Sequence, residues 1–540
     1  MKQDTFYHIC FLLHVGVMIS SVSSYYSPNN NKSFTSESLE KYINETVRKG
    51  KKVVQLPAKK IFYIDKTLII PNNMTISGNG CELKGKMIEC KTGYKPINIL
   101  KIENGENIVI QDITFDGGLL EHYFSETKSL SDVANTIKIE NSKNITLKNC
   151  TLKNVTSNWI KGGERYFGAL GISNSQRIVL INFQLINFKT EGVVFYNSTD
   201  IIIEDFKLTS KHQGWTPLHF WYCRNILCKD SEFDCYEGGG STINGAFSNA
   251  LFDNVTIKGG KGIQFSNELN ETKYDSSNIT IKNSSINTKG FGIGRWNYDN
   301  TICRNIKIIG TQINIKESPN PNKYYAWGVR LDNVENVDIV NCKINASIPN
   351  SAVCCITGAK NIIITDNEIK ADKFLFLNLN DFSISGLTIK KNDITFIKLN
   401  SENENNSVFL FKNRENTKKK TTVSDLLFVY NKINNLNGNL FENNLENSRF
   451  NYFNNIEITS NIINSQSLNN VFSNINNGGK IRFINNQFLN QGPFIITDFN
   501  EIDVVNNTYT FSNKKNLPNI ENLLITKGTK SIIKKSNIIQ

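Results

Sequence analysis

The chain has 540 residues, of which 39% are hydrophobic and 20% charged, and its formal net charge is +12. This composition excludes a disordered chain, because enough apolar residues are present for a packed core. Membrane-spanning helices are also excluded, because no segment has the roughly 20 apolar residues that such a helix needs. The positive charge fits an acidic polysaccharide, nucleic acid, an anionic membrane or simply a lysine-rich surface, so it carries little weight.

The first element is a short apolar run at 9–19, which follows Lys2 and precedes the small residues at 20–24. This order is typical of a secretory signal, and the alternative is a buried N-terminal helix. We predict a signal peptide at 1–24 and therefore a secreted or cell-surface protein.

The next element is a helix at about 36–49, which places Leu39 and Ile43 on one face and ends at Gly50. A stack of strands exposes its core and its sheet edges at each end unless something covers them. We predict that this helix caps the N-terminal end of such a stack.

A repeat then fills most of the chain. An Asn-Ile pair begins an apolar alternation at 107–108, 144–145, 225–226, 278–279, 305–306, 361–362 and 455–456. Some coils have a variant of this pair, with Asp, Arg, Lys or Glu in the first place or another apolar residue in the second. When these variants are included, successive pairs are mostly about 20 to 37 residues apart, as in solenoid proteins. Each repeat contains three short runs with a period of two, which indicates three short strands with one buried face. Stacked repeats of this kind form three parallel sheets around an apolar interior.

The predicted fold is therefore all-β: a single-stranded right-handed parallel β-helix of about 13 to 15 coils with an N-terminal capping helix. Asparagine before the second strand tolerates the left-handed backbone of a sharp bend, and its amide can bond the same side chain one coil away. We place the β-helix domain at 25–512 and a C-terminal cap or tail at 513–540.

Eleven cysteines are present, and none forms a Cys-x-x-Cys pair, so a zinc site is unsupported. We expect most of them to be small apolar core residues, although an export route would permit a disulfide.

The helix, the segment "VVQLPAKKIFYIDKTLIIPNNMTISGNGCELKG" and the "NITLKNCTLKN" units resemble the pectin-lyase-like superfamily over about 36–512. The resemblance implies the parallel β-helix fold. That superfamily includes polysaccharide lyases, glycoside hydrolases, epimerases, phage tailspikes and adhesins, so the resemblance alone does not choose a reaction. Calcium-dependent pectate lyases of this superfamily carry acidic clusters on the groove. No such cluster occurs here, so we expect no cofactor, with Ca²⁺ as an alternative that no acidic cluster supports.

The alternation predicts which side chains point outward from one sheet and line a groove along the axis. Stacked in register, the outward residues form a ladder of Gly171, Val194, His219, Gln264 and Arg330. Asn244 and Arg295 lie in irregular coils and are assigned to the same ladder.

Aromatic and charged residues concentrate in the segments that enter this sheet. We predict that a polysaccharide binds there, since aromatic faces stack on sugar rings; the alternative is that these aromatic residues only pack loops onto the solenoid. The predicted substrate-binding residues are Trp215, Gln264, Asn244, Arg295, Trp296, Tyr325, Trp327 and Arg165.

Two reactions remain open. A β-eliminating lyase needs a base and cations beside a uronate carboxylate, for which the candidates are His219, His212, Arg330 and Lys211. A hydrolase needs two carboxyl groups, for which the candidates are Glu191, Glu237 and Glu164. The polygalacturonase-like motifs are missing apart from "TEG" at 190–192. The basic residues favour a lyase acting on an acidic glycan, with a hydrolase or a non-catalytic tailspike-like or adhesin-like binding protein as alternatives. We expect no nucleic-acid partner.

Overall fold

The structure is a computed structural model, and it describes residues 34–540 except 87, 91–92, 96–97, 119–135, 156–167, 189–190, 211–215, 236–240, 267–273, 275, 297–300, 318–325, 380–381, 398–405, 413–420, 437, 445–450, 466–469, 473–477, 491–493, 498, 512–523, 528, 530 and 540. The predicted signal at 1–24 lies outside these residues. Within the described part, no helix is both long and apolar enough to cross a membrane.

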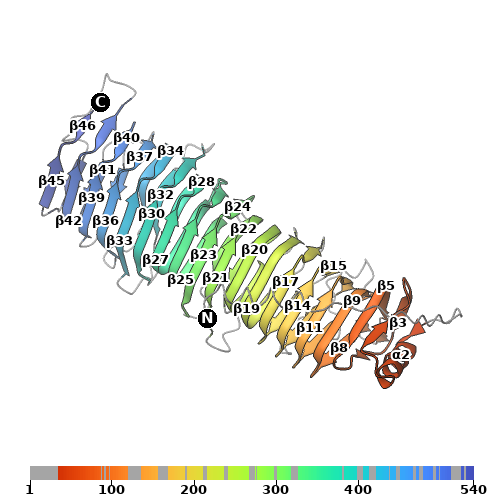
Figure 1. The fold of residues 1–540 in the computed structure, drawn as a ribbon. Coiled ribbons are helices and arrows are strands. Elements are labelled where there is room, and N and C mark those ends of the chain that lie inside the picture. Colours follow the sequence, from red (N-terminus) through yellow and green to blue (C-terminus); the bar gives the residue numbers. More distant parts are fainter. Residues whose placement is uncertain are drawn as a thin grey trace. The chain divides into compact units, whose positions relative to one another are not determined.

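The predicted capping helix is confirmed as α2, Ser36–Arg48. Its N-cap is Thr35, whose hydroxyl accepts a hydrogen bond from the backbone N–H of Ser38 and thereby satisfies one of the helix's orphan donors. Leu39 and Ile43 are buried in the core, so the helix covers one end of the stack of coils (Figure 1).

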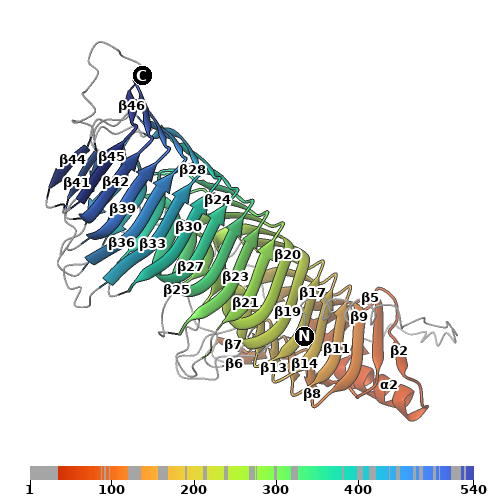
Figure 2. The ribbon, with the colours of Figure 1, turned by 60° about the vertical axis from the view of Figure 1, so that its left-hand side comes forward.

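The repeats form parallel strands that stack coil upon coil (Figures 1 and 2). One continuous series of parallel pairings contains 17 strands among the described residues, against the 13 to 15 coils expected. The series is β5 (Thr75–Gly85), β9 (Glu106–Asp116), β11 (Lys143–Lys148), β14 (Gln176–Ile181), β17 (Thr199–Glu204), β19 (Thr216–Cys235), β20 (Ser241–Phe265), β21 (Ser277–Lys282), β23 (Cys303–Ile309), β25 (Ala326–Val340), β27 (Ser351–Thr365), β30 (Ile384–Lys390), β33 (Thr421–Val429), β36 (Asn451–Thr459), β39 (Gly478–Ile484), β42 (Phe499–Val505) and β45 (Ser531–Lys535).

Two further series complete each coil, and β19, β20, β25 and β27 are long enough to pass through more than one of them. The series that precedes the first contains β4 (Leu68–Ile69), β8 (Leu100–Glu103), β10 (Ile137–Glu140), β13 (Leu170–Ser173), β16 (Glu191–Tyr196), β29 (Lys373–Asn378), β32 (Asn406–Lys412) and β35 (Gly438–Asn444). The series that follows contains β12 (Thr151–Val155), β15 (Gln184–Phe188), β18 (Lys207–Thr209), β22 (Ser285–Arg295), β24 (Gln312–Ile315), β26 (Lys343–Ala346), β28 (Glu368–Ala371), β31 (Asp393–Phe396), β34 (Lys432–Leu436), β37 (Ile462–Ser465), β40 (Gln487–Leu489), β43 (Thr508–Thr510) and β46 (Ile538–Ile539).

The remaining strands lie at the N-terminal end or in side sheets. They are β1 (Phe34–Thr35), β2 (Val53–Gln55), β3 (Ile61–Ile64), the antiparallel pair β6 (Ile88–Cys90) and β7 (Gly93–Lys95), and the parallel group β38 (Asn470–Phe472), β41 (Phe494–Thr497) and β44 (Leu524–Lys527). One continuous apolar cluster runs through the interior from α2 to β43. The predicted fold class, a parallel β-helix with a capping helix, is confirmed.

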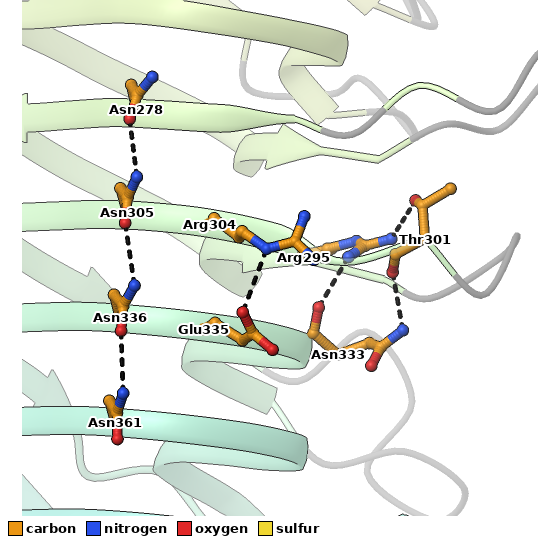
Figure 3. Close-up of polar contacts among 9 residues, drawn as sticks. All are labelled: Asn278, Arg295, Thr301, Arg304, Asn305, Asn333, Glu335, Asn336 and Asn361. Atoms are coloured by element: carbon orange, nitrogen blue, oxygen red, sulfur yellow. Dashed lines mark hydrogen bonds and ion pairs between the residues drawn. The ribbon is translucent and has the colours of Figure 1, made fainter.

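The asparagines of the Asn-Ile pairs occupy sharp bends with a left-handed backbone, as predicted. Asn305, for example, has φ 58°. Its amide donates to Asn278 at 2.9 Å and accepts from Asn336 at 3.1 Å, and Asn361 continues the ladder (Figure 3). Each side chain thus ties two coils together at the surface.

A second asparagine ladder lies inside the C-terminal half. Asn461 illustrates it: Oδ1 accepts from the backbone N–H and the Nδ2 of Asn431, and Nδ2 donates to Phe428 O at 2.8 Å and to Asn486 Oδ1 at 3.0 Å. The amides are therefore buried without losing their hydrogen bonds. The members are Asn367, Asn392, Asn431, Asn461, Asn486, Asn507 and Asn537.

The C-terminal boundary differs from the prediction. Instead of a separate cap after residue 512, β45 and β46 add another coil in parallel register with β42 and β43. The solenoid therefore continues to Ile539. Ile532 pairs with the buried Ile502 yet is itself 42% exposed, because no described coil follows it.

The cysteines have the predicted role. Those that the structure describes with their side chains are buried and unbridged, which fits small apolar core residues. They are Cys81, Cys150, Cys223, Cys228, Cys235, Cys303, Cys342, Cys354 and Cys355. Burial raises the pKa of the Cys228 thiol to about 12, so it stays protonated and unreactive at neutral pH.

Candidate functional site

The predicted outward ladder exists. Gly171 pairs with Val194, Val194 with His219, and His219 with Asn244. One strand, β20, then contains both Asn244 and Gln264 in successive coils, and beyond it Gln264 pairs with Gly294 and Gly294 with Arg330. The neighbours Leu218, Phe220, Val329 and Leu331 belong to the interior cluster, so the inward and outward assignments are confirmed.

A second row of side chains stands three residues before the ladder in each coil. In this row Glu191 pairs with Thr216, Lys261 with Phe291, and Phe291 with Trp327. A strict alternation would direct Glu191 inward, like Val193. Its contact with His219 shows that the strand entrance departs from that alternation, so the outer face carries two rows of side chains instead of one.

The centre of the polar region is a histidine–carboxylate pair. His219 Nδ1 lies 3.1 Å from Glu191 Oε2. Because a carboxylate only accepts hydrogen bonds, Nδ1 donates to Glu191, and a ring that carries a single proton has its lone pair on Nε2. The Trp221 ring packs against the imidazole, with ring centroids 4.2 Å apart, and holds its orientation. This arrangement leaves Nε2 chemically suited to accept a proton.

Amide and hydroxyl groups continue the polar region in the next coils. Gln264 Oε1 accepts a hydrogen bond from Ser241 Oγ at 2.6 Å. Asn244 stands beside His219, one strand spacing of about 4.8 Å away. Glu191, His219, Asn244, Gln264 and Ser241 thus form a compact polar patch on the outer side of the sheet. Both amides are buried in it.

Two atoms of this patch are buried without a hydrogen-bond partner among the described residues: His219 Nε2 and Asn244 Oδ1. His219 is 6% exposed and Asn244 4%. A buried polar atom without a partner costs about 1–3 kcal/mol, and most buried polar atoms in native proteins are bonded. Two such atoms in adjacent coils of one face mark this patch as the candidate site.

Arg330 lies in a different environment. Its Nε and Nη2 donate to Asp332 Oδ2 at 2.9 and 2.7 Å, and its guanidinium stands 4.1 Å from the centre of the Trp296 ring. A guanidinium beside a buried carboxylate stays charged and has no lone pair to accept a proton. Of the two predicted base candidates that the structure describes, His219 and Arg330, only His219 can therefore serve as a base.

The structure also separates these two residues. Four strand spacings of about 4.8 Å place Arg330 about 19 Å from His219 along the axis. Arg330 therefore cannot contact the same sugar carboxylate that His219 would act on. Its side chain, 20% exposed, can contribute only a distant positive charge to the same face.

Beyond Arg330 the outward positions become apolar and buried. Trp327 is 8% exposed and packs edge to face on Phe376 at 5.1 Å. It belongs to a small cluster, separate from the interior core, that contains Phe291, Trp327, Ala352, Cys355, Phe376 and Leu410 with Trp296 against it. Packing, the alternative weighed for the aromatic residues, describes Trp327 better than a sugar contact.

Arg295 lies outside the ladder. Gly294 occupies the ladder position, and Arg295 pairs with the core-facing Leu331. Its guanidinium is 2% exposed and donates to Asn333 O at 2.8 Å and to Thr301 Oγ1 at 2.7 Å (Figure 3). These bonds fasten a coil corner and leave Arg295 away from the polar patch.

Seven predicted site residues lie outside the described residues: Lys211, His212, Trp215, Glu237, Glu164, Tyr325 and Arg165. In the described part, no group of three or more histidine, cysteine and acidic side chains could hold a metal ion. Sequence reasoning missed the partnership of Glu191 with His219 and the role of Ser241. The sequence contained a signal for both, because Glu191 stands three positions before Val194 and Ser241 three positions before Asn244.

The stacked coils and their continuous interior define the class of protein, a parallel β-helix. No protein-family model matches the sequence, and no curated protein matches it. Among solved structures, the chain is similar to tailspike protein 3 of bacteriophage CBA120, at 8% identity and a TM-score of 0.38. That match covers 78% of this chain and spans 61% of the tailspike chain.

The chain is also similar to two other solved structures. The A-module of a mannuronan C-5 epimerase from Azotobacter vinelandii is 13% identical with a TM-score of 0.35, and the match covers 76% of this chain and 91% of that chain. The tailspike protein of E. coli bacteriophage HK620, in complex with a hexasaccharide, is 11% identical with a TM-score of 0.35 and coverages of 93% and 74%. The likeness to all three is one of fold.

Proposed function

We propose that the protein binds a polysaccharide across the outer face of the coils from β16 to β25 and cleaves it by β-elimination, with His219 as the base. The observation that carries the proposal is the His219–Glu191 pair at 3.1 Å, whose second ring nitrogen is buried without a partner among the described residues. The solved structures to which the chain is similar include a tailspike in complex with a hexasaccharide and a mannuronan C-5 epimerase module.

The chemistry follows from the pair. Nε2 takes the proton α to a uronate carboxylate, the C–H electron pair becomes the new C=C bond, and the glycosidic oxygen leaves as the new chain end. Glu191 stabilises the imidazolium that forms, because its carboxylate faces Nδ1. Since Nε2 is buried in this structure, the proposal requires side-chain movement on the outer face when a sugar binds.

Elimination is favoured over hydrolysis for a specific reason. Hydrolysis needs two carboxyl groups about 5 to 9.5 Å apart that are available to the sugar. Glu191 is already occupied by His219. Elimination also needs a cation at the substrate carboxylate, and because Arg330 is four coils away we assign that role to Lys211, with Asn244 and Gln264 bonding sugar hydroxyls.

Incubation of the purified protein with polygalacturonate, alginate, hyaluronate and a neutral β-glucan tests the proposal. We expect the ultraviolet absorbance of an unsaturated product to rise with one of the acidic polymers. His219→Ala should abolish this signal, and Glu191→Gln should lower kcat about 100-fold with little change in KM, because the ring loses its orientation.

Val194→Ala is the matched control, since Val194 is the buried ladder residue one coil before His219. It should leave kcat within a few-fold of the unsubstituted protein. Reducing ends without new absorbance would reject elimination and indicate hydrolysis. Binding without either product would leave a non-catalytic glycan-binding protein.

We also propose that the protein is exported, on the strength of the sequence at 1–24. Expression in a secretion-competent host should deliver the mature chain to the medium. Removal of residues 1–24 should retain it inside the cell, and equal secretion of both forms would contradict the proposal.

A further inference from the structure

The coil that carries His219 breaks a surface ladder at its next corner. In the preceding coils this corner holds Asn141, Asn174 and Asn197, each with a left-handed backbone, and Asn197 Nδ2 donates to Asn174 Oδ1 at 2.9 Å. The same corner after Trp221 holds Tyr222, with φ 57°. Asparagine adopts this conformation readily, whereas a bulky tyrosine is strained there and gives up the amide hydrogen bond.

The corner of Tyr222 is also irregular toward the next coil. The register between β19 and β20 shifts between Trp221 and Cys223, because the next coil turns this corner with one residue fewer. A bulge of this kind redirects a side chain, and bulges concentrate next to active sites. Here it directs an aromatic ring to the corner beside the polar patch.

The ring of Tyr222 stands in a cluster of aromatic residues. Its centroid is 5.9 Å from that of Tyr196, 6.4 Å from that of Trp221 and 5.7 Å from that of Tyr274. Tyr196, Tyr222 and Tyr274 are half-buried, and Trp221 is buried against the imidazole of His219. The cluster therefore extends from the polar patch round the corner to the surface.

The cluster is held rigidly. The hydroxyl of Tyr274 donates to Cys223 O at 2.9 Å and lies 2.9 Å from Ser248 Oγ, and burial raises its pKa. The guanidinium of Arg224 lies 5.9 Å from the centre of its ring. An aromatic surface that is fixed before a ligand arrives loses little side-chain entropy on binding.

We propose that Tyr222, together with Tyr196 and Tyr274, forms a sugar-stacking subsite beside His219, in which an aromatic ring packs on the apolar face of a pyranose. The inference rests on the proposed function, since it concerns the same polysaccharide. It accounts for the strained tyrosine, because strain of this kind persists where the surrounding structure and a function require it. The ligand class is a pyranose polymer with at least one sugar beyond the reacting unit.

Tyr430 provides a matched control. It is another tyrosine with a left-handed backbone, φ 56°, but it is 62% exposed and lies in the C-terminal half. Asparagine at either position relieves the same backbone strain. Tyr222→Asn and Tyr430→Asn should therefore both melt at or above the temperature of the unsubstituted protein, so that a loss of binding cannot be ascribed to unfolding.

Affinity electrophoresis in gels containing polygalacturonate, alginate, hyaluronate or a neutral β-glucan measures the binding. Tyr222→Asn should lose about tenfold in affinity, Tyr222→Phe should keep it, and Tyr430→Asn should match the unsubstituted protein. Unchanged retention of Tyr222→Asn would overturn the subsite, even if His219→Ala abolished cleavage. Weaker retention of Tyr222→Asn with no cleavage by any variant would support the subsite and reject the catalytic proposal. If no polymer retards the unsubstituted protein, both are rejected.

Discussion

The N-terminal and C-terminal halves of the solenoid solve one structural problem in two ways. At the inward corner before the third strand of each coil, the C-terminal half has the buried asparagine ladder from Asn367 to Asn537. The N-terminal half has a different residue in nearly every coil. In order these are Cys150, Phe183, Phe206, Ser231, Val255, Ser284, Thr311 and Cys342.

The difference explains where a site can form. Identical amides in successive coils satisfy one another and fix a uniform geometry, which suits a scaffold. The mixed corners of the N-terminal half rely on packing and single hydroxyl bonds, and the same half contains the irregular corner at Tyr222, where the next coil has one residue fewer. The two unpartnered atoms of the candidate site, His219 Nε2 and Asn244 Oδ1, lie in this half, whereas the buried hydroxyls Ser407 Oγ and Thr529 Oγ1, also without a partner among the described residues, lie in the other half. The regular asparagine ladder and the candidate site thus lie in different halves of the chain.

Removing a member of the buried ladder should have the largest effect on stability. Asn461→Ala leaves the backbone N–H of Asn431 without its acceptor and removes the bonds that Asn431 Nδ2 and Phe428 O make with this amide, which should cost about 3–5 kcal/mol. Ser284→Ala, at the same corner of the other half, removes the acceptor of the Val255 N–H and the donor to Lys282 O and should cost about 1–2 kcal/mol. Urea unfolding followed by circular dichroism measures both. Equal losses would show that the two halves do not differ in this way.

The fold was predictable because two physical signals repeat in every coil. Alternation gave the inward and outward faces, and the left-handed preference of asparagine gave the corners, as Asn305 shows. The buried ladder was visible only as recurrent Asn pairs such as 485–486 and 506–507. Nothing local distinguishes a buried amide from an exposed one, since burial depends on the coil above.

The site was predictable only in part. His219 and Arg330 follow from the alternation, but their separation depends on how many coils lie between them, and β20 winds through two sheet positions without a clear repeat boundary. The pairing of Glu191 with His219 depends on a strand entrance that departs from alternation. Arg295 was misplaced by one residue for the same reason, because Gly294 takes the ladder position.

A buried carboxylate in the C-terminal half should give a smaller, pH-dependent effect. Burial raises the pKa of Asp372 from 3.8 to about 6, although Asn406 Nδ2 donates to it at 3.3 Å. Between these values the folded protein holds a proton that the unfolded chain has released, so the unfolding free energy falls as pH rises through this window. Polar groups of this half can therefore be bonded and still be destabilising.

Asp372→Asn should remove that dependence. Relative to the unsubstituted protein, its unfolding free energy should change by a constant amount below about pH 4 and gain about 2–3 kcal/mol between about pH 4 and pH 6. Urea midpoints across this range measure the gain. If the urea midpoints of the variant and of the unsubstituted protein changed with pH in parallel, Asp372 would titrate alike in the folded and unfolded chains.

The exposed ladder should give the smallest effect. Asn305→Gly removes the amide that bridges Asn278 and Asn336 but keeps a residue that adopts φ 58° without strain, so the loss should stay below about 1 kcal/mol. Asn305→Ala should lower the free energy of unfolding by about 1–2 kcal/mol more, because the Cβ of alanine makes the left-handed backbone unfavourable. If the glycine variant were as unstable as Asn461→Ala, the amide bonds themselves would dominate in both ladders. A small loss instead assigns the surface asparagines chiefly to their backbone conformation and the buried ones to their hydrogen bonds.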